Sequence, residues 1–170
     1  IKYDDIVPHP DEVEAVSKAI EKTGKPILLS LSPGGKVQQT EDAIKLLMMG
    51  NMLRVTHDIW DDQKGIDQCF AAWRKWNGYS KPGFWIDMDM IPFGNLQLMS
   101  PQPKDKTKKQ KAVRLSGRGY SRVSQFTKPQ MYTFITMRAL SASPLMMGGD
   151  LPTLDDFSLK LITNKDVLEC

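Results

Sequence analysis

Short apolar segments alternate with amphipathic segments along the entire chain, and this alternation restricts the possible folds more than any other feature. Apolar segments suited to strands occupy residues 1–7, 27–32, 53–59, 84–90 and 144–150. Apolar residues at helical spacing predict helices over residues 11–24, 40–50, 62–79, 124–142 and 154–169. Because a helix follows each strand, the order indicates parallel strands with right-handed crossovers, and therefore an α/β fold.

Two parallel architectures fit this order, a doubly wound open sheet and part of a (β/α)8 barrel of the TIM type. The chain has neither Gly-x-Gly-x-x-Gly after its first strand nor Gly-x-x-x-x-Gly-Lys, so the nucleotide-binding open sheets lose support. A complete barrel needs eight units and about 250 residues, whereas this chain has 170 residues and five units. Since residues 1–7 read as a strand from within a protein, we expect a piece of a larger one. The chain would then be the second half of a barrel.

The composition is that of one globular domain. Hydrophobic residues make up 41% and charged residues 25%, and 170 residues is an ordinary domain size. No apolar run approaches the roughly 20 residues of a membrane-spanning helix, so we expect no membrane partner. The two cysteines, Cys69 and Cys170, are too few for a disulfide-held scaffold. Residues 1–170 are therefore interpreted as a single partial domain.

Residues 101–122 are strongly basic, although the net charge of the chain is only +3. The segment holds eight lysines and arginines and one acid, and it belongs to an insertion predicted at about residues 96–122. Binding of single-stranded nucleic acid also requires aromatic side chains, and Tyr120 is the one aromatic residue in the segment. Because like charges repel and stay solvated, the segment is predicted to be a surface loop without a nucleic-acid partner.

Two acids near the predicted strand ends are distinguished by a cation on the same strand. Lys2 precedes Asp4 by two residues, and Arg54 precedes Asp58 by four. Side chains two or four residues apart on a strand point to one face, so each carboxylate is expected beside its cation at the ligand-binding edge of the sheet. Two opposed carboxylates can hydrolyse a glycosidic bond. Two internal salt bridges fit the same pattern, and the residues alone leave both interpretations open.

Other chemistries find little support in the sequence. His9 and His57 are far apart and neither belongs to a metal-binding pattern, so neither a metal nor a cofactor is predicted. Ser30 and Ser32 lack the Gly-x-Ser-x-Gly turn of serine hydrolases. Cys69 lies on the apolar face of a predicted helix, where packing in the core is its expected role.

Five short motifs resemble glycoside hydrolase family 27 in order and approximate spacing. They are Lys2-Tyr3-Asp4, Arg54-x-x-x-Asp58 followed by Ile59 and Asp61-Asp62, Trp85-x-Asp87-x-Asp89-Met90 followed by Gly94-Asn95, Ala142-Ser143-Pro144-Leu145-Met146-Met147 with Asp150-Leu151, and Asn164-Lys165-Asp166-Val167. The family comprises α-galactosidases, α-N-acetylgalactosaminidases and some β-L-arabinopyranosidases. The resemblance extends over essentially the whole chain, and it implies a (β/α)8 barrel of which this chain covers about strands four to eight.

The resemblance also implies a retaining mechanism through a covalent glycosyl-enzyme intermediate. Asp4, after strand four, would be the nucleophile, and Asp58, after strand six, the general acid/base. Lys2 resembles the lysine that binds sugar hydroxyls and keeps the nucleophile ionised, and Arg54 resembles the arginine near C2 of the sugar. The implied partners are a carbohydrate substrate, the N-terminal half of the barrel and, through open sheet edges, a second copy of the chain. Alone, the chain is expected to be poorly active.

One loop departs from the family pattern. Where the family usually has Ser-Cys-x-Trp-Pro, this chain has Ser30-Leu31-Ser32-Pro33-Gly34-Gly35. By resemblance, Ser32 and Gly34 would bind the substrate near its substituent at C2, but the missing tryptophan leaves the choice of sugar open. The alternative is a non-catalytic carbohydrate-binding or interaction module on the same scaffold. Family members often act outside the cytoplasm, so the resemblance alone favours a periplasmic or extracellular location.

Overall fold

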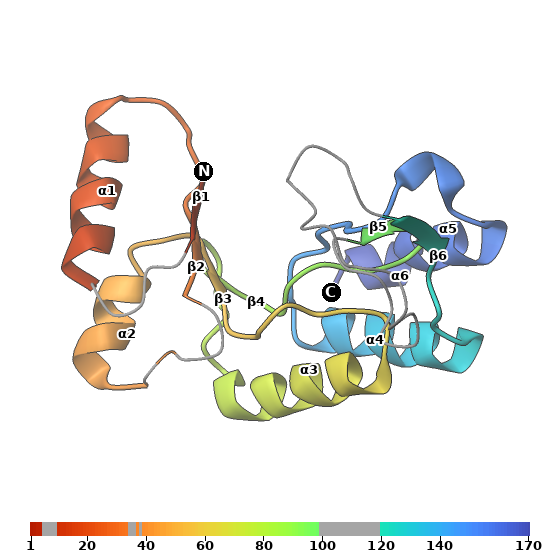
Figure 1. The fold of residues 1–170 in the computed structure, drawn as a ribbon. Helices are drawn as coiled ribbons and strands as arrows, with labels where there is room; N and C mark the ends of the chain where they lie inside the picture. Colours follow the sequence, from red (N-terminus) through yellow and green to blue (C-terminus); the bar gives the residue numbers. More distant parts are fainter. Residues whose placement is uncertain (5–9, 34–36, 38, 99–119) are drawn as a thin grey trace, which may run out of the picture.

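The centre of the molecule is a four-stranded parallel sheet. The computed structural model describes residues 1–4, 10–33, 37, 39–98 and 120–170. The sheet consists of β1 (Lys2–Asp4), β2 (Ser30–Ser32), β3 (Met52–Arg54) and β4 (Trp85–Asp87), which neighbour one another in the order of the sequence (Figure 1). The predicted α/β fold with parallel strands is confirmed. A doubly wound sheet reverses its strand order at one point, and these four strands do not reverse, which favours a barrel segment.

Helices follow the strands and cover the sheet. α1 (Pro10–Lys22) packs against α2 (Glu41–Leu47), and α3 (Gln63–Trp76) packs against α4 (Lys128–Leu140). The single helix predicted over residues 154–169 is wrong: the chain forms α5 (Asp156–Ile162) and α6 (Lys165–Leu168), after a short 3-10 turn, η2 (Leu151–Thr153). The break occurs because Asn164 caps α6, its side chain accepting the N–H of Val167 at 3.2 Å.

Local hydrogen bonds set where the helices begin and end. The side chain of Thr40 accepts the N–H of Ala43, and the side chain of Asp62 accepts the N–H of Gly65, so α2 and α3 start where the sequence predicts. Asp11, the first residue of the helix predicted over residues 11–24, lies in the first turn of α1, where its negative charge interacts favourably with the positive end of the helix dipole.

The fifth predicted strand is wrong as a regular strand. Residues 144–150 make only isolated bridges, among them a parallel one from Met147 to Ile91. The chain ends β4 at Asp87 and then turns at Asp89, whose φ is 71°. Residues 88–91 therefore leave the regular ladder, and only Ile91 meets the later segment, through backbone hydrogen bonds with Met146 and Gly148.

A two-stranded antiparallel sheet flanks the main sheet. β5 (Asn95–Leu98) and β6 (Tyr120–Val123) pair along their length, with Asn95 opposite Val123. These strands are the two ends of the insertion predicted at about residues 96–122, so its ends are paired strands. The basic stretch between them, residues 99–119, lies outside the described residues.

The two faces of the main sheet carry different side chains. On one face Leu31, Leu53 and Ile86 are buried in the hydrophobic core. Because side chains alternate along a strand, the residues after these point to the other face. The register aligns them at the carboxyl end of the sheet in a polar row of Asp4, Ser32, Arg54 and Asp87.

Among the described residues, none of the helices has both the length and the apolar character needed to span a membrane.

Candidate active site

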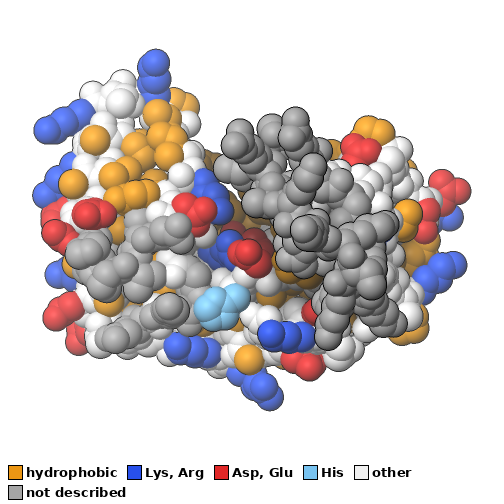
Figure 2. All heavy atoms as spheres, viewed as in Figure 1, with side chains coloured by type: hydrophobic (Ala, Val, Ile, Leu, Met, Phe, Trp, Pro, Cys, Tyr) orange, Lys and Arg blue, Asp and Glu red, His pale blue; other side chains and the backbone are white. Residues whose placement is uncertain are grey.

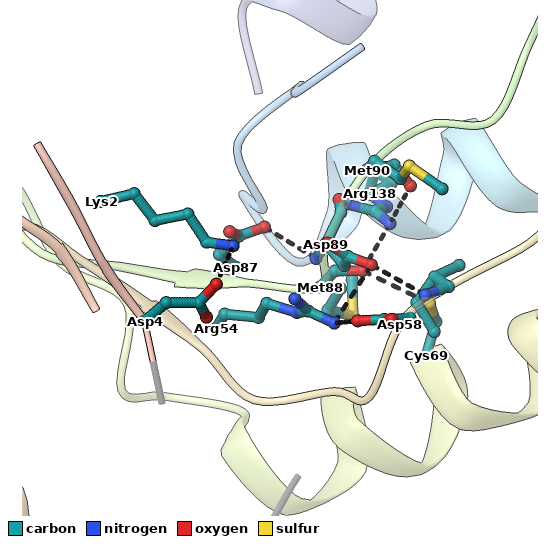
Figure 3. A network of polar contacts seen from close by, with 11 residues as sticks. Lys2, Asp4, Arg54, Asp58, Cys69, Asp87, Met88, Asp89, Met90 and Arg138 are labelled. Carbon is teal, nitrogen blue, oxygen red and sulfur yellow. Dashed lines mark hydrogen bonds and ion pairs between the residues drawn. The ribbon is translucent and has the colours of Figure 1, made fainter. Parts of the chain in front are cut away.

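The polar row lies at the carboxyl end of the strands, where the strand-to-helix connections of a parallel α/β sheet form ligand sites. Figure 2 shows acidic and basic side chains side by side near the centre of this view, where the surface is hollowed. The close view in Figure 3 resolves the contacts among the charged residues from β1, β3 and β4. These contacts decide how the predicted acids are held.

Lys2 and Asp4 form the first predicted pair. Nζ of Lys2 lies 3.0 Å from Oδ2 of Asp4, and the two side chains are 53% and 57% exposed. Strand alternation places them on one face of β1, as the spacing predicts. A neighbouring ammonium favours the ionised form of a carboxyl group, so this contact suits a carboxylate that acts as a nucleophile.

Arg54 and Asp58 form the second predicted pair, but by a different geometry. Nη2 of Arg54 donates to Oδ1 of Asp58 at 2.6 Å (Figure 3). The strand predicted over residues 53–59 is wrong in its extent, because β3 ends at Arg54 and Asp58 lies in the following loop. The Arg54 side chain is only 10% exposed and that of Asp58 is 78% exposed. A buried cation therefore holds an accessible carboxyl group.

A third carboxylate, Asp89, joins this pair to the end of β4. Its Oδ2 accepts the backbone N–H of Ile59 at 2.7 Å and lies 3.4 Å from Nη2 of Arg54. The N–H of Asp89 in turn donates to Oδ1 of Asp87 at 2.8 Å. Burial raises the pKa of Asp87, although the nearby Arg138 opposes that shift. The sequence placed Asp87 and Asp89 near a strand end, but no pattern in it indicated these contacts.

The two predicted substrate-binding residues of the loop have different outcomes. Ser32 pairs with Asp4 in the strand register and is 3% exposed, so the structure brings it beside the first carboxylate. Gly34 lies outside the described residues, and so does His9. The predicted role of Gly34 remains a prediction.

Two further residues weighed in the sequence interpretation, Cys69 and His57, lie in described parts of the chain. Cys69 is fully buried, and burial raises the pKa of its thiol to about 11, so it is a core residue rather than a nucleophile. His57 is exposed. Among the described residues, no three His, Cys, Asp or Glu side chains are grouped as metal ligands.

An ion pair that sequence reasoning missed anchors β6 to the loop that contains Asp58. Arg122 binds both carboxylate oxygens of Asp61, with Nη2 at 2.9 Å from Oδ1, and the N–H of Gln125 donates to the same carboxylate. The Asp61 side chain is only 1% exposed. Burial alone would raise the pKa of Asp61, but the hydrogen bonds from Arg122 and Gln125 outweigh it and hold this pKa below its ordinary value.

Replacing Asp61 with Asn should lower the free energy of unfolding by about 3 kcal/mol at pH 7, because a buried charge pair loses one partner. The pKa of Asp61 is lowered in the folded state, so its contribution is present above the unfolded value of about 4. It is lost as the pH falls through the folded-state pKa. Urea unfolding of both proteins at a series of pH values below 7 measures this difference.

The matched control for that series is Glu169→Gln, which removes an exposed partner of Lys165. This change should leave the urea midpoint almost unchanged at every pH, because exposed ion pairs contribute little. A destabilisation by Asp61→Asn that stayed constant from pH 7 to well below pH 4 would contradict the linkage to Asp61.

Comparison with known proteins gives relatives along nearly all of the chain. The alpha-galactosidase 2 of Arabidopsis thaliana is 28% identical over 153 residues, which cover 90% of this chain and 31% of that protein. The alpha-galactosidase of Cyamopsis tetragonoloba is 24% identical, with 90% and 30% covered. This chain thus spans about a third of the length of these curated relatives. No family model matches it.

Solved structures give a similar result. A GH27 β-L-arabinopyranosidase from Geobacillus stearothermophilus superposes with a TM-score of 0.80 at 34% sequence identity, covering 99% of this chain and 36% of that one. A variant of that enzyme in complex with arabinose gives a TM-score of 0.79, also at 34% identity. The resemblance predicted from the five motifs is therefore confirmed over essentially the whole chain.

Proposed function

Because this chain is a segment similar to glycoside hydrolase family 27, we propose that it carries both catalytic carboxylates of a retaining exo-glycosidase. The substrates would be terminal α-galactosides, α-N-acetylgalactosaminides or β-L-arabinopyranosides. The observation that carries this proposal is the arrangement of Asp4 and Asp58. Asp4 ends β1 and Asp58 lies in the loop after β3, each beside its own cation, at 3.0 Å and 2.6 Å.

In the proposed reaction Asp4 attacks the anomeric carbon and the bond to the leaving-group oxygen breaks. Asp58, which must begin protonated, gives its proton to that oxygen. In the second step Asp58 takes a proton from water, the water oxygen attacks the anomeric carbon, and Asp4 is released as a carboxylate. Lys2 supports the ionised nucleophile. Arg54 stabilises the carboxylate that Asp58 becomes once its proton has gone to the leaving group, and it contacts the sugar. Ser32 and Gly34 would contact the sugar near C2.

We infer that the chain corresponds to about strands four to eight of a (β/α)8 barrel. The sequential order of β1 to β4 supports this placement, because a barrel winds in one direction. The N-terminal half of the barrel would then pair along the edge of β1 and complete the sugar site. This chain covers about a third of the length of its relatives. The substrate and the partner are therefore proposed for a whole protein that contains this chain.

The names of the relatives suggest one class of sugar. α-D-Galactopyranosides and β-L-arabinopyranosides have the same configuration around the ring and differ in the hydroxymethyl group at C5. A site that accepts one of these sugars can bind the other through the hydroxyl groups that they share. The two sugars differ by one substituent, and a single buried group gives only modest discrimination between substrates. The polar row gives no contact that selects between them.

The test is hydrolysis of three aryl glycosides by the chain and by any longer protein that contains it. The substrates are an α-galactoside, an α-N-acetylgalactosaminide and a β-L-arabinopyranoside, and proton NMR follows the first-formed sugar. Turnover of at least one, with retained anomeric configuration, is expected. Inversion would contradict a nucleophilic Asp4. Sugar binding without turnover of any substrate would instead support the carbohydrate-binding module, which the altered loop at Ser30–Gly35 keeps as the alternative.

A further inference from the structure

Arg138 is a buried arginine on α4, a helix in which most residues are apolar. It lies on α4 with 0% exposure, and its Cζ sits 4.6 Å from the centre of the Phe134 ring. Burial lowers the pKa of its guanidinium, because a charge in the core loses its hydration. A group with this cost persists in a core only when its hydrogen bonds and counter-charges compensate.

The guanidinium binds three successive carbonyl groups after β4. Its Nη2 donates to the carbonyl oxygens of Met88 at 2.6 Å and Met90 at 3.2 Å, and its Nη1 donates to that of Asp89 (Figure 3). Asp89 has a φ of 71°, a conformation that residues other than glycine rarely adopt. Arg138 therefore holds the backbone of an unfavourable turn from the core side.

On the opposite side of that turn, the Asp89 carboxylate faces the loop that contains Asp58. It accepts the N–H of Ile59 at 2.7 Å and lies 3.4 Å from Arg54. Ile59 is the next residue after Asp58, and Arg54 binds the Asp58 carboxyl group at 2.6 Å. Both the backbone and the side chain of Asp58 are thus linked to Asp89.

We propose that Arg138 is a positioning residue for Asp58, acting through the turn at Asp89. This inference rests on the proposed function, in which Asp58 is the acid/base. The Asp58 side chain is 78% exposed, so its own packing does little to orient it, and its position depends on Ile59 and Arg54. A displacement of about 1 Å of a catalytic group can cost about 100-fold in rate. Arg138 does not touch the reacting atoms.

The test compares Arg138→Met, Arg138→Lys and a control, Ile135→Val. Ile135 is a buried residue of the same helix, 2% exposed. Its apolar side chain gives no hydrogen bond to the turn. The Met variant removes all three hydrogen bonds and replaces Arg138 with an uncharged, unbranched side chain. The Lys variant keeps the charge but lacks the planar fork that reaches several carbonyls at once.

Two readouts separate positioning from a general loss of stability. The first is hydrogen exchange of the Ile59 amide, which should become at least about 10-fold faster in Arg138→Met than in the control when both are folded. The second is kinetics on an aryl glycoside, where kcat should fall about 10- to 100-fold with KM within about threefold of wild type. Arg138→Lys should lie between Arg138→Met and wild type in both.

Unchanged Ile59 exchange in Arg138→Met would overturn the inference whatever the activity. Faster exchange with kcat equal to that of Ile135→Val, in a wild type that hydrolyses glycosides, would overturn it as well. If Arg138→Met does not fold, the same two comparisons for Arg138→Lys decide. A longer protein that contains this chain and hydrolyses no glycoside would contradict the proposed function instead, and Ile59 exchange would still report whether Arg138 holds the loop.

Discussion

Replacing Asp4 with Asn should reduce hydrolysis of every accepted glycoside by at least about 1,000-fold while leaving sugar binding largely intact. The proposed nucleophile loses its charge and cannot form the covalent intermediate, whereas the shape of the side chain and its place on β1 are kept. Steady-state rates on the best aryl glycoside measure the loss, and calorimetric titration with the free sugar measures binding.

The fold should survive this change, because Lys2 and Asp4 form an exposed pair that contributes little to stability. Asp42→Asn is the matched control, since Asp42 is an exposed acid in the first turn of α2 and belongs to neither of the two acid–cation pairs. It should retain full activity. Substantial hydrolysis by Asp4→Asn would show that Asp4 is not the nucleophile. Equal sugar binding and no hydrolysis in both wild type and variant would support the binding module.

Replacing Asp58 with Ala should slow hydrolysis in a way that depends on the leaving group. For a leaving group that needs a proton, the rate should fall about 100- to 10,000-fold, because the general acid is missing. A dinitrophenyl glycoside, whose leaving group departs as an anion, should lose much less in the first step. Rates on a series of aryl glycosides of decreasing leaving-group pKa measure this dependence.

Azide gives a second readout for the same variant. It needs no base to attack a glycosyl-enzyme intermediate, so it should restore turnover of the dinitrophenyl glycoside and yield a glycosyl azide of retained configuration. Asp42→Ala serves as the control. Its rates on the series of aryl glycosides should equal those of wild type, and azide should not increase them. An equal loss for all leaving groups, without azide rescue, would contradict an acid/base role for Asp58.

Much of the fold could be predicted because it depends on neighbouring residues. Thr40 and Asp62 cap their helices through N–H groups three residues ahead, so the sequence shows both partners together. The same holds for Lys2 and Asp4, whose pairing follows from the alternation of side chains along a strand. The apolar periodicity likewise identified Cys69 as a core residue.

The errors arose where the backbone departs from regular geometry. The strand predicted through Asp58 ends at Arg54, and the loop that follows is held by Asp89, which is 30 residues from its partner Ile59. The last predicted strand failed because the positive φ of Asp89 redirects the chain after β4. An apolar run indicates that a segment is buried, but it does not show whether a neighbouring strand is present to pair with it.

The sequence by itself determined the alternation of strands and helices, the core positions, the acid–cation pairs and the resemblance to a glycosidase family, because each depends on local spacing. Tertiary structure decided how the acids are held: Arg122 reaches Asp61 across 61 residues, and Arg138 binds carbonyls of a turn about 50 residues away. A charged side chain in a sequence shows that it needs partners, whereas the packing of distant helices and strands selects which groups come within hydrogen-bond distance.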